Sequence, residues 1–195
     1  MTEQAEVRRV LREWSETSFR LESLDEYTVE SEAPRLGAFL RGEPVRPHDQ
    51  NLEGWLERLR GEREQGKRRI RVHAIAGPLT PYLRYEIEWG YTANALAGEE
   101  IHLVHRDTWE ETPFGRRPPD FYLLDDRTVV VMVYDEIGHW LGGDVITDPS
   151  EVARYREMRD QALASSVSLR DYLAAWRRTP VPPPAVERAA LRASV

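Results

Sequence analysis

Apolar side chains follow a helical spacing before residue 67 and an alternating one after it. In the first part, sets such as Val7, Val10, Leu11 and Trp14, or Leu52, Trp55, Leu56 and Leu59, recur at three- and four-residue steps. This spacing places apolar side chains along one face of a helix. A short stretch at 18–22 instead alternates polar with apolar residues, as an extended piece does. We therefore expect residues 1–66 to form a helical N-terminal segment packed on a core.

Residues 67–178 carry the pattern of an α/β core. Ile70, Val72 and Ala74 lie on one side of a predicted strand, with Arg71 and His73 on the other. Further strands are expected at 101–104, 121–124, 129–133 and 140–146, and helices at 81–96, 150–164 and 169–176. A helix between the first two core strands predicts a parallel pair, and the following strands read as a hairpin. The expected fold is a mixed sheet of about five to six strands covered by helices.

Composition narrows the classes of site that the chain can hold. The 195 residues include no cysteine, which excludes disulfides, thiolate metal sites and a cysteine nucleophile. The charged N-terminus lacks a signal-peptide pattern, and no run of about 18 apolar residues occurs, so we expect a cytoplasmic protein without a membrane span. Residues 179–195 are rich in proline and then alanine, and we expect a flexible tail there.

Charge is unevenly distributed along the chain. The formal net charge of −7 makes general affinity for nucleic acid unfavourable. Residues 58–71 nevertheless hold seven basic groups and two acidic ones, whereas residues 99–151 hold 13 acidic and four basic groups. The basic stretch leaves nucleic-acid binding open as an alternative, although separate basic and acidic patches favour oriented contacts with a protein.

The predicted helix after the first core strand carries a dense group of side chains with possible chemistry. The group comprises Tyr82, Arg84, Tyr85, Glu86, Glu88, Trp89, Tyr91 and Asn94. Aromatic rings beside arginine and glutamate can enclose a planar or cationic ligand. The same rings could instead form core while the charges extend to solvent. Both interpretations stay open at this point.

Carboxylates are concentrated around the predicted hairpin. They are Asp120, Asp125, Asp126, Asp135, Glu136, Asp144 and Asp148. Such a group could bind magnesium or supply an acid–base pair. Asp125-Asp126 and Asp135-Glu136 fall where strands turn, however, and aspartate favours turns for local hydrogen-bonding reasons. Since the spacing matches no calcium loop or two-metal signature, we expect no metal site.

Familiar catalytic motifs are absent. The five histidines form no HExxH pair, and the patterns GxSxG, GxGxxG and the complete P-loop, GxxxxGK followed by Ser or Thr, do not occur. His139, four residues after Asp135, is the best candidate for a general base, although a solvent-facing turn histidine explains it as well. We expect no cofactor.

A set of short motifs spans residues 18–172. They are Phe19-Arg20-Leu21-Glu22, Tyr27, Gly42-Glu43, Trp55, Arg71-Val72, Tyr82-Leu83-Arg84-Tyr85-Glu86, Asn94, Gly98-Glu99, Asp120-Phe121-Tyr122-Leu123-Leu124-Asp125, Met132-Val133-Tyr134-Asp135 and Gly138. Together they resemble an uncharacterised bacterial family of the actinomycete type, often encoded beside helix-turn-helix regulators. The resemblance implies no activity, but it suggests such a regulator as a partner.

A second resemblance is to phospholipase-D-like domains, in which a strand–helix–strand unit precedes a segment ending in an aspartate before a hairpin. That superfamily's catalytic pattern is His-x-Lys-x4-Asp. When Asp125 is the aspartate, Pro118 stands in place of the histidine and Asp120 in place of the lysine. A prolyl ring cannot attack phosphorus, and a carboxylate repels phosphate, so the resemblance implies the fold without the phosphodiesterase chemistry.

These observations lead to a ranked set of functions. The leading one is a non-catalytic binding or regulatory module with a degenerate active-site-like cleft between the helix at 82–94 and the hairpin, where a small molecule or a protein partner would bind. The residues expected at this cleft are Arg71, His73, Tyr82, Arg84 and Tyr85 on one wall and Asp120, Tyr134 and Asp135 on the other. The alternative is a small cofactor-independent enzyme of specialised metabolism, with Asp135 or His139 as base and Arg84 holding an anion. The second alternative is nucleic-acid binding through 58–71. The sequence indicates no oligomeric state.

Overall fold

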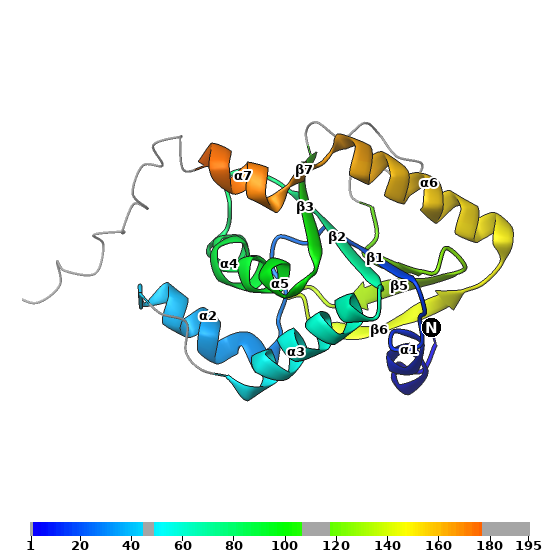
Figure 1. Ribbon diagram of the computed structural model, residues 1–195, viewed down its shortest axis with the longest axis horizontal. Helices are drawn as coiled ribbons and strands as arrows, with labels where there is room; N and C mark the ends of the chain where they lie inside the picture. The colour runs from blue at the N-terminus through cyan, green and yellow to red at the C-terminus, as the bar shows by residue number, and fades with distance from the viewer. Residues whose placement is uncertain (1, 45–48, 107–117, 177–195) are drawn as a thin grey trace, which may run out of the picture.

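The computed structural model describes residues 2–44, 49–106 and 118–176, which build one seven-stranded mixed sheet covered by helices (Figure 1). The strands are β1 (Thr17–Glu22), β2 (Arg68–Ile75), β3 (Glu100–His105), β4 (Phe121–Leu124), β5 (Thr128–Tyr134), β6 (Trp140–Ile146) and β7 (Val167–Ser168), in the spatial order β6-β5-β4-β1-β2-β3-β7. β1, β2 and β3 are parallel, and every other neighbouring pair is antiparallel. The mixed α/β sheet and the parallel pair are confirmed. One strand exceeds the expected number, because the two residues of β7 are too few to show a periodic pattern.

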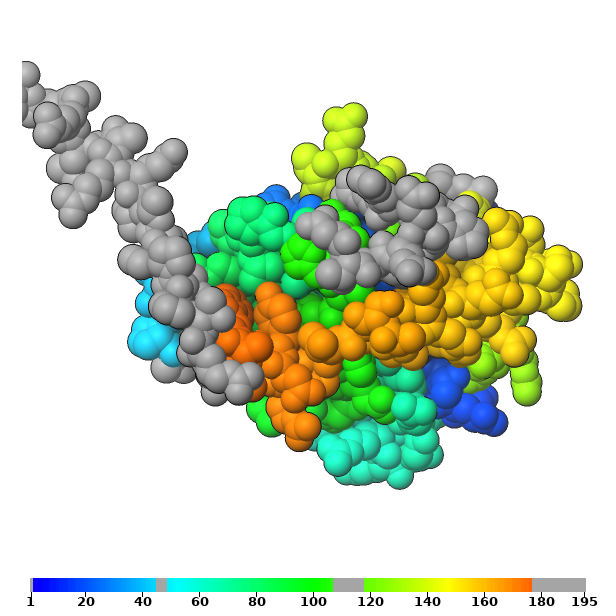
Figure 2. Space-filling model, turned by 90° about the horizontal axis from the view of Figure 1, so that it is seen from above, coloured from blue at the N-terminus to red at the C-terminus, as the bar shows by residue number. Residues whose placement is uncertain are grey.

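The helices form two layers, one on each face of the sheet. They are α1 (Gln4–Val10), the 3-10 turn η1 (Glu30–Glu32), α2 (Ala33–Leu40), α3 (Gln50–Glu64), α4 (Pro81–Tyr85), the π turn η2 (Glu86–Gly90), α5 (Tyr91–Ala97), α6 (Pro149–Ser165) and α7 (Leu169–Trp176). α6 lies on one side of the sheet, and α2 to α5 lie on the other (Figure 1). Figure 2 shows α6 and α7 following one another across the face seen from above.

The alternation along β1 and β2 assigns opposite chemistry to the two faces of the sheet. Phe19, Leu21 and Val72 enter an apolar core with Met158 and other side chains of α6. The residues between them in sequence point to the other face, where the parallel register places Arg20 opposite Arg71. A short apolar alternation of this kind buries one face of a strand and leaves the other for a second layer. Here that second layer is helical, so charged side chains become enclosed between sheet and helices.

The strand β1 occupies the centre of the sheet, between β4 and β2. The stretch at 18–22 was expected to be extended, but its alternation gave no information about its neighbours. The first 66 residues therefore contribute both covering helices and a central strand. Within the described residues, no helix combines the length and the apolar character needed to cross a membrane. The expected tail at 179–195 lies outside the described residues.

The helix expected at 81–96 is present but irregular. Thr80 caps it by accepting a hydrogen bond from the Leu83 N–H at 3.1 Å, and it ends before Gly98, whose φ of 123° suits a residue without a side chain. The π turn η2 interrupts it, and the Thr92 hydroxyl donates to the Ile87 carbonyl five residues earlier at 3.0 Å. A π turn inserts part of a turn into the helix and so rotates the side chains that follow it.

Candidate functional site

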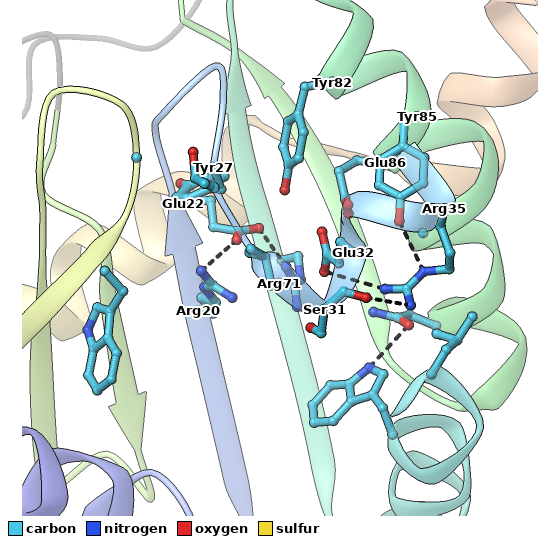
Figure 3. Close-up of a pocket in the computed structure, with 18 of the residues that line it drawn as sticks. Arg20, Glu22, Tyr27, Ser31, Glu32, Arg35, Arg71, Tyr82, Tyr85 and Glu86 are labelled. Carbon is cyan, nitrogen blue, oxygen red and sulfur yellow. Dashed lines mark hydrogen bonds and ion pairs between the residues drawn. The ribbon is translucent and has the colours of Figure 1, made fainter. Parts of the chain in front are cut away.

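A cavity of about 350 Å³ lies between the charged face of the sheet and the helices α2 to α5 (Figure 3). The sheet contributes Arg20, Glu22, Arg71, Tyr122, Met132, Tyr134 and Trp140; the helices and loops contribute Tyr27, Thr28, Val29, Ser31, Glu32, Arg35, Asn51, Leu52, Trp55, Tyr82, Tyr85, Glu86, Gly90, Asn94 and Gly138. Aromatic walls around a few convergent polar groups are typical of small-molecule sites.

The floor of the cavity is a buried network of alternating charges. The Glu22 carboxylate lies 2.8 Å from the Arg20 guanidinium and 2.7 Å from that of Arg71. Arg71 also donates to Glu99 at 3.0 Å. Burial acts to raise the pKa of Glu22, but the two guanidinium groups outweigh it and lower that pKa to about 2. Glu22 is therefore ionised at neutral pH, and its ion pairs hold the side chains of Arg20, Glu22 and Arg71 in fixed positions.

Arg20 is further fixed by aromatic rings. Its guanidinium lies 5.1 Å from the centroid of the Tyr122 ring and 5.8 Å from that of Tyr27, within the range of cation–π attraction. One guanidinium nitrogen donates to the Tyr134 hydroxyl at 3.3 Å. The Nε atom of Arg20, by contrast, is buried and has no hydrogen-bond partner within the described part of the chain.

Two carboxylates lie across the cavity from Arg20. Glu86 on η2 and Glu32 on η1 extend toward each other (Figure 3). Burial and the nearby Glu32 raise the pKa of Glu86 well above its ordinary range. Burial also raises the pKa of Glu32, opposed by the neighbouring Arg35. Two closely spaced carboxyl groups therefore form this end of the cavity. Of the two, only Glu32 lies next to an arginine, Arg35.

The structure brings together four of the eight residues expected at the cleft. Arg71, Tyr82, Tyr85 and Tyr134 line the cavity. The other four are His73, Arg84, Asp120 and Asp135, and they lie elsewhere for separate reasons given below.

His73 and Asp120 lie in the protein beneath the cavity. The ring of His73 is fully buried, with Nδ1 2.6 Å from the Tyr91 hydroxyl and Nε2 2.8 Å from the Leu24 carbonyl. Burial lowers the pKa of His73, so its ring is neutral and supports the floor. The Asp120 carboxylate accepts hydrogen bonds from the Tyr27 hydroxyl and from the backbone and side chain of Ser23. Both residues position other groups.

Arg84 points away from the cavity and forms an ion pair with Glu88 on the same helix at 3.2 Å. Successive side chains of an α-helix are rotated by about 100° around its axis. Arg84, two residues from both Tyr82 and Glu86, therefore lies on nearly the opposite side of the helix from them. An anion held by Arg84 would therefore lie outside this cavity.

Asp135 and His139, the candidate acid–base pair, close the turn between β5 and β6. The Asp135 carboxylate accepts from the backbone N–H groups of Ile137 and His139, and lies 3.3 Å from Nδ1 of His139. Neither residue lines the cavity. The hydrogen bonds of Asp135 are those of an aspartate-stabilised turn.

Asp125 has a structural role of longer range. Its carboxylate accepts from the backbone N–H groups of Ser15, Glu16 and Thr17 at 2.7, 2.8 and 2.9 Å, which joins the hairpin to the start of β1. Local turn chemistry therefore accounts for the carboxylate of Asp135 but not for that of Asp125, which binds the backbone of a distant segment. Within the described residues, no three metal-ligating side chains come together.

Most of the basic side chains at 58–71 are already paired within the protein. Arg58 and Arg69 both bind Glu62, Arg68 binds Glu100, and Lys67 donates to the Trp14 carbonyl. Arg71 belongs to the cavity floor. Of the seven basic groups, these contacts leave Arg60 and Arg63, which is a weak electrostatic footprint for a polyanion.

The same stretch contains a partial P-loop pattern. Residues 61–67 read GEREQGK, and Arg68 stands where the complete motif has Ser or Thr. A P-loop leads from a strand into a helix, whose N-terminus binds phosphate. Here the order is reversed, because α3 ends at Glu64 and β2 begins at Arg68. The segment therefore offers no helix N-terminus to a nucleotide.

Several cavity residues were not singled out from the sequence. Arg20, Glu22, Glu32 and Arg35 lie in the first 66 residues, which were expected only to pack on the core. Alternation at 18–22 could have indicated Arg20 and Glu22, since two charges on one face of a strand with an apolar opposite face must be paired or solvated. Glu86 belonged to the aromatic helix group but was not assigned to the cleft.

Comparison with known proteins places the chain among domains without an assigned activity. A family model, the domain of unknown function DUF6879, matches residues 5–174. No curated protein matches the chain. Among solved structures, a phospholipase D family member, Nuc from Salmonella typhimurium, is similar with a TM-score of 0.50 and 8% sequence identity, over 84% of this chain and 88% of that chain. At this identity the similarity shows the fold alone, and it confirms the expected phospholipase-D-like architecture.

Proposed function

We propose, from the premise that the chain belongs to the DUF6879 family of domains of unknown function, that it is a binding module whose cavity takes a small polar organic molecule. In this proposal the protein does not transform the molecule. It holds it between the charged floor formed by β1 and β2 and the helices above.

The observation that carries this proposal is the position of unsatisfied polar atoms. Within the described residues, four buried side-chain nitrogen or oxygen atoms lack a hydrogen-bond partner, and three belong to residues that line the cavity: Arg20 Nε, Glu32 Oε2 and Trp140 Nε1. Leaving such an atom buried and unpaired costs about 1–3 kcal/mol each. A ligand, or a ligand together with a water molecule, that forms hydrogen bonds with these atoms would remove this cost, so their position favours a ligand site.

The size and stiffness of the cavity also support a small ligand. A volume of about 350 Å³ is near the lower end of the range for small-molecule pockets and is too small for a folded partner segment. Since Arg20, Glu22 and Arg71 are fixed by their own ion pairs, a ligand would meet a preformed surface and lose little affinity to reorganisation.

The positions expected to carry phosphodiesterase chemistry have other roles, which supports a non-catalytic module. The Pro118 carbonyl accepts a hydrogen bond from the Ser23 hydroxyl at 2.8 Å, and Asp120 binds Ser23 and Tyr27. The candidate acid–base pair, Asp135 and His139, closes a turn outside the cavity.

The proposal includes a cellular role that rests on sequence resemblance. The resemblance described in the sequence analysis implies a gene position beside helix-turn-helix regulators. We propose that this module acts in the cytoplasm and that such a regulator binds it differently when the cavity holds a ligand.

A thermal-shift screen against a mixed library of small cations, anions and neutral polar compounds tests ligand binding. A compound at about 100 times its Kd stabilises a protein by about 2.7 kcal/mol, which raises the Tm of a domain this size by several degrees. Val29→Trp, a change at a partly exposed cavity wall, should abolish the shift, whereas Val167→Trp, at an exposed valine on β7, should preserve it. No shift from any compound, or equal shifts in both variants, would contradict the proposed function.

A further inference from the structure

We propose that the ligand carries an organic cation, an ammonium or amidinium group, which binds between Glu32 and Glu86. This inference rests on the proposed function of the cavity and specifies the class of molecule that occupies it. It follows from which charges in the cavity are already paired, from the surroundings of Glu86 and from the aromatic wall beside it.

The arginines of the cavity wall already have carboxylate partners. Arg20 binds Glu22, Arg71 binds both Glu22 and Glu99, and Arg35 binds Asp49. Arg35 also donates to the Tyr85 hydroxyl and the Ser31 carbonyl, at 3.2 Å each. An anionic ligand would therefore have to compete with buried carboxylates for the charge of each of these cations, which makes it a poor occupant. The unpaired donors Arg20 Nε and Trp140 Nε1 need only a neutral acceptor of the ligand or a water that enters with it.

Glu86 is the acidic group left without a partner. Its residue is only 8% exposed, it lines the cavity, and no donor within the described residues forms a hydrogen bond with its carboxylate. Buried carboxylates are normally paired or hydrogen-bonded, because an isolated buried charge is costly. Together with Glu32, whose Oε2 atom also lacks a partner, it presents acceptors where a cationic donor would fit.

The local backbone makes room for this arrangement. A Cβ atom on Gly90, four residues after Glu86 in the π turn, would lie 2.7 Å from Oε2 of Glu86. Any side chain at this position would displace the carboxylate from its present place. The glycine therefore leaves room for the Glu86 carboxylate at the cavity wall, and π turns of this kind often occur at functional sites.

The walls beside the carboxylates suit an organic cation. The rings of Tyr82 and Tyr85 lie next to Glu86, with centroids 6.1 Å apart, and Tyr82 points into the cavity (Figure 3). Aromatic faces attract ammonium and guanidinium groups at about 6 Å from the ring centroid. A metal ion fits less well, because no cluster of three metal-ligating side chains forms among the described residues and metal sites need more oxygen ligands.

Binding of the cation should compete with a proton. The charged and titratable groups that interact electrostatically with Glu86 are Glu32, Arg71, Glu22, Arg20 and the hydroxyls of Tyr82, Tyr85 and Tyr91. Burial and these carboxylates raise the pKa of Glu86, so the empty cavity retains a proton there. A ligand cation stabilises the ionised carboxylate and releases that proton, so its affinity should increase with pH.

The test uses a defined set of probes and a matched pair of variants of the full chain. The probes are the cations agmatine, tyramine, histamine and benzamidine, with the anions phenylacetate and nicotinate and the neutral phenylacetamide for comparison. Binding is measured by calorimetry with wild type, Glu86→Gln and Glu88→Gln. Glu88 is the exposed partner of Arg84 on the same helix, so its replacement removes the same charge outside the cavity.

The expected result is that at least one cation binds, with affinity that increases with pH, that Glu86→Gln weakens it by about 10- to 100-fold and that Glu88→Gln leaves it unchanged. Cation binding unaffected by Glu86→Gln would overturn the inference. Binding of only the anions or the neutral compound, blocked by Val29→Trp, would also overturn it while leaving the proposed function intact. If neither these probes nor the screening library binds, both fail. Because the amide replacement removes a buried acid, Glu86→Gln should fold, and its unfolding transition in urea verifies this.

Discussion

Replacement of Glu22 by glutamine removes the central anion of the cavity floor while keeping its shape. The surrounding charges lower the pKa of Glu22 from an ordinary 4.5 to about 2. Each pKa unit corresponds to about 1.4 kcal/mol, so ionised Glu22 contributes about 3 kcal/mol to the free energy of unfolding at pH 7. The variant also leaves Arg20 buried without a carboxylate, and breaking a buried ion pair from one side costs about 3–5 kcal/mol. We expect a loss of about 3 kcal/mol, or about 6–12 °C in Tm.

The dependence of this loss on pH gives the sharper test. Between about pH 5 and pH 2 the unfolded chain binds more protons at Glu22 than the native protein does, so the stabilisation is complete above this window and is lost as pH falls through it. The variant lacks this titration, so the difference from wild type should shrink steadily as pH falls. Urea unfolding, followed by tryptophan fluorescence at pH 7, 5, 4 and 3, measures it.

Glu100→Gln is the matched control. Glu100 pairs with Arg68 at 2.9 Å on the surface, with 44% and 60% of the two side chains exposed. Exposed pairs contribute less than about 1 kcal/mol. The reasoning would be refuted if Glu22→Gln differed from wild type by less than about 1 kcal/mol at pH 7, or if its deficit were the same at pH 7 and pH 3.

Three further predictions follow from the packing and the helix. Phe121→Ala should cost about 3–5 kcal/mol in urea unfolding, because the buried ring packs on Tyr155 with centroids 4.9 Å apart; a loss below about 1 kcal/mol would contradict this. Since the native protein retains the Glu86 proton above the unfolded pKa, wild-type stability at this site decreases as pH rises, and Glu86→Gln should gain on wild type between pH 4 and pH 8; a constant difference would argue against it. Thr80→Ala should lower the free energy of unfolding by about 1 kcal/mol through the lost helix cap, whereas an unchanged value would mean that the cap contributes nothing.

The local elements of this fold were largely accessible from the sequence. The alternation in β2, with Ile70 and Val72 on one side and Arg71 on the other, predicted both the strand and its two faces, and the structure confirms them. The helix expected at 81–96 is also present, and the structure shows that Thr80 caps its start and that Gly98 follows its end. These features depend on side-chain period and backbone preferences within about 20 residues, which a single sequence records directly.

The site was predictable only in part. Arg71, Tyr82, Tyr85 and Tyr134 were assigned to one cleft and do line one cavity, because the helix between β2 and β3 must cover the sheet. Asp135 was assigned to the hairpin wall of the same cleft, yet its carboxylate accepts hydrogen bonds within its own turn. Local hydrogen bonding competes with any role at a distance, and the residue pattern does not show which one prevails.

Sequence patterns alone were enough to predict the fold class, six of the seven strands and the polar and apolar faces of β1 and β2. Tertiary structure alone decided that β1 lies between β4 and β2, which places Arg20 and Glu22 beside Arg71. It also decided that η1 and the π turn bring Glu32 and Glu86 together above them (Figure 3). Periodicity fixes which face a side chain takes, whereas its partners depend on the order of strands and the placement of helices, which arise from packing between segments far apart in the chain.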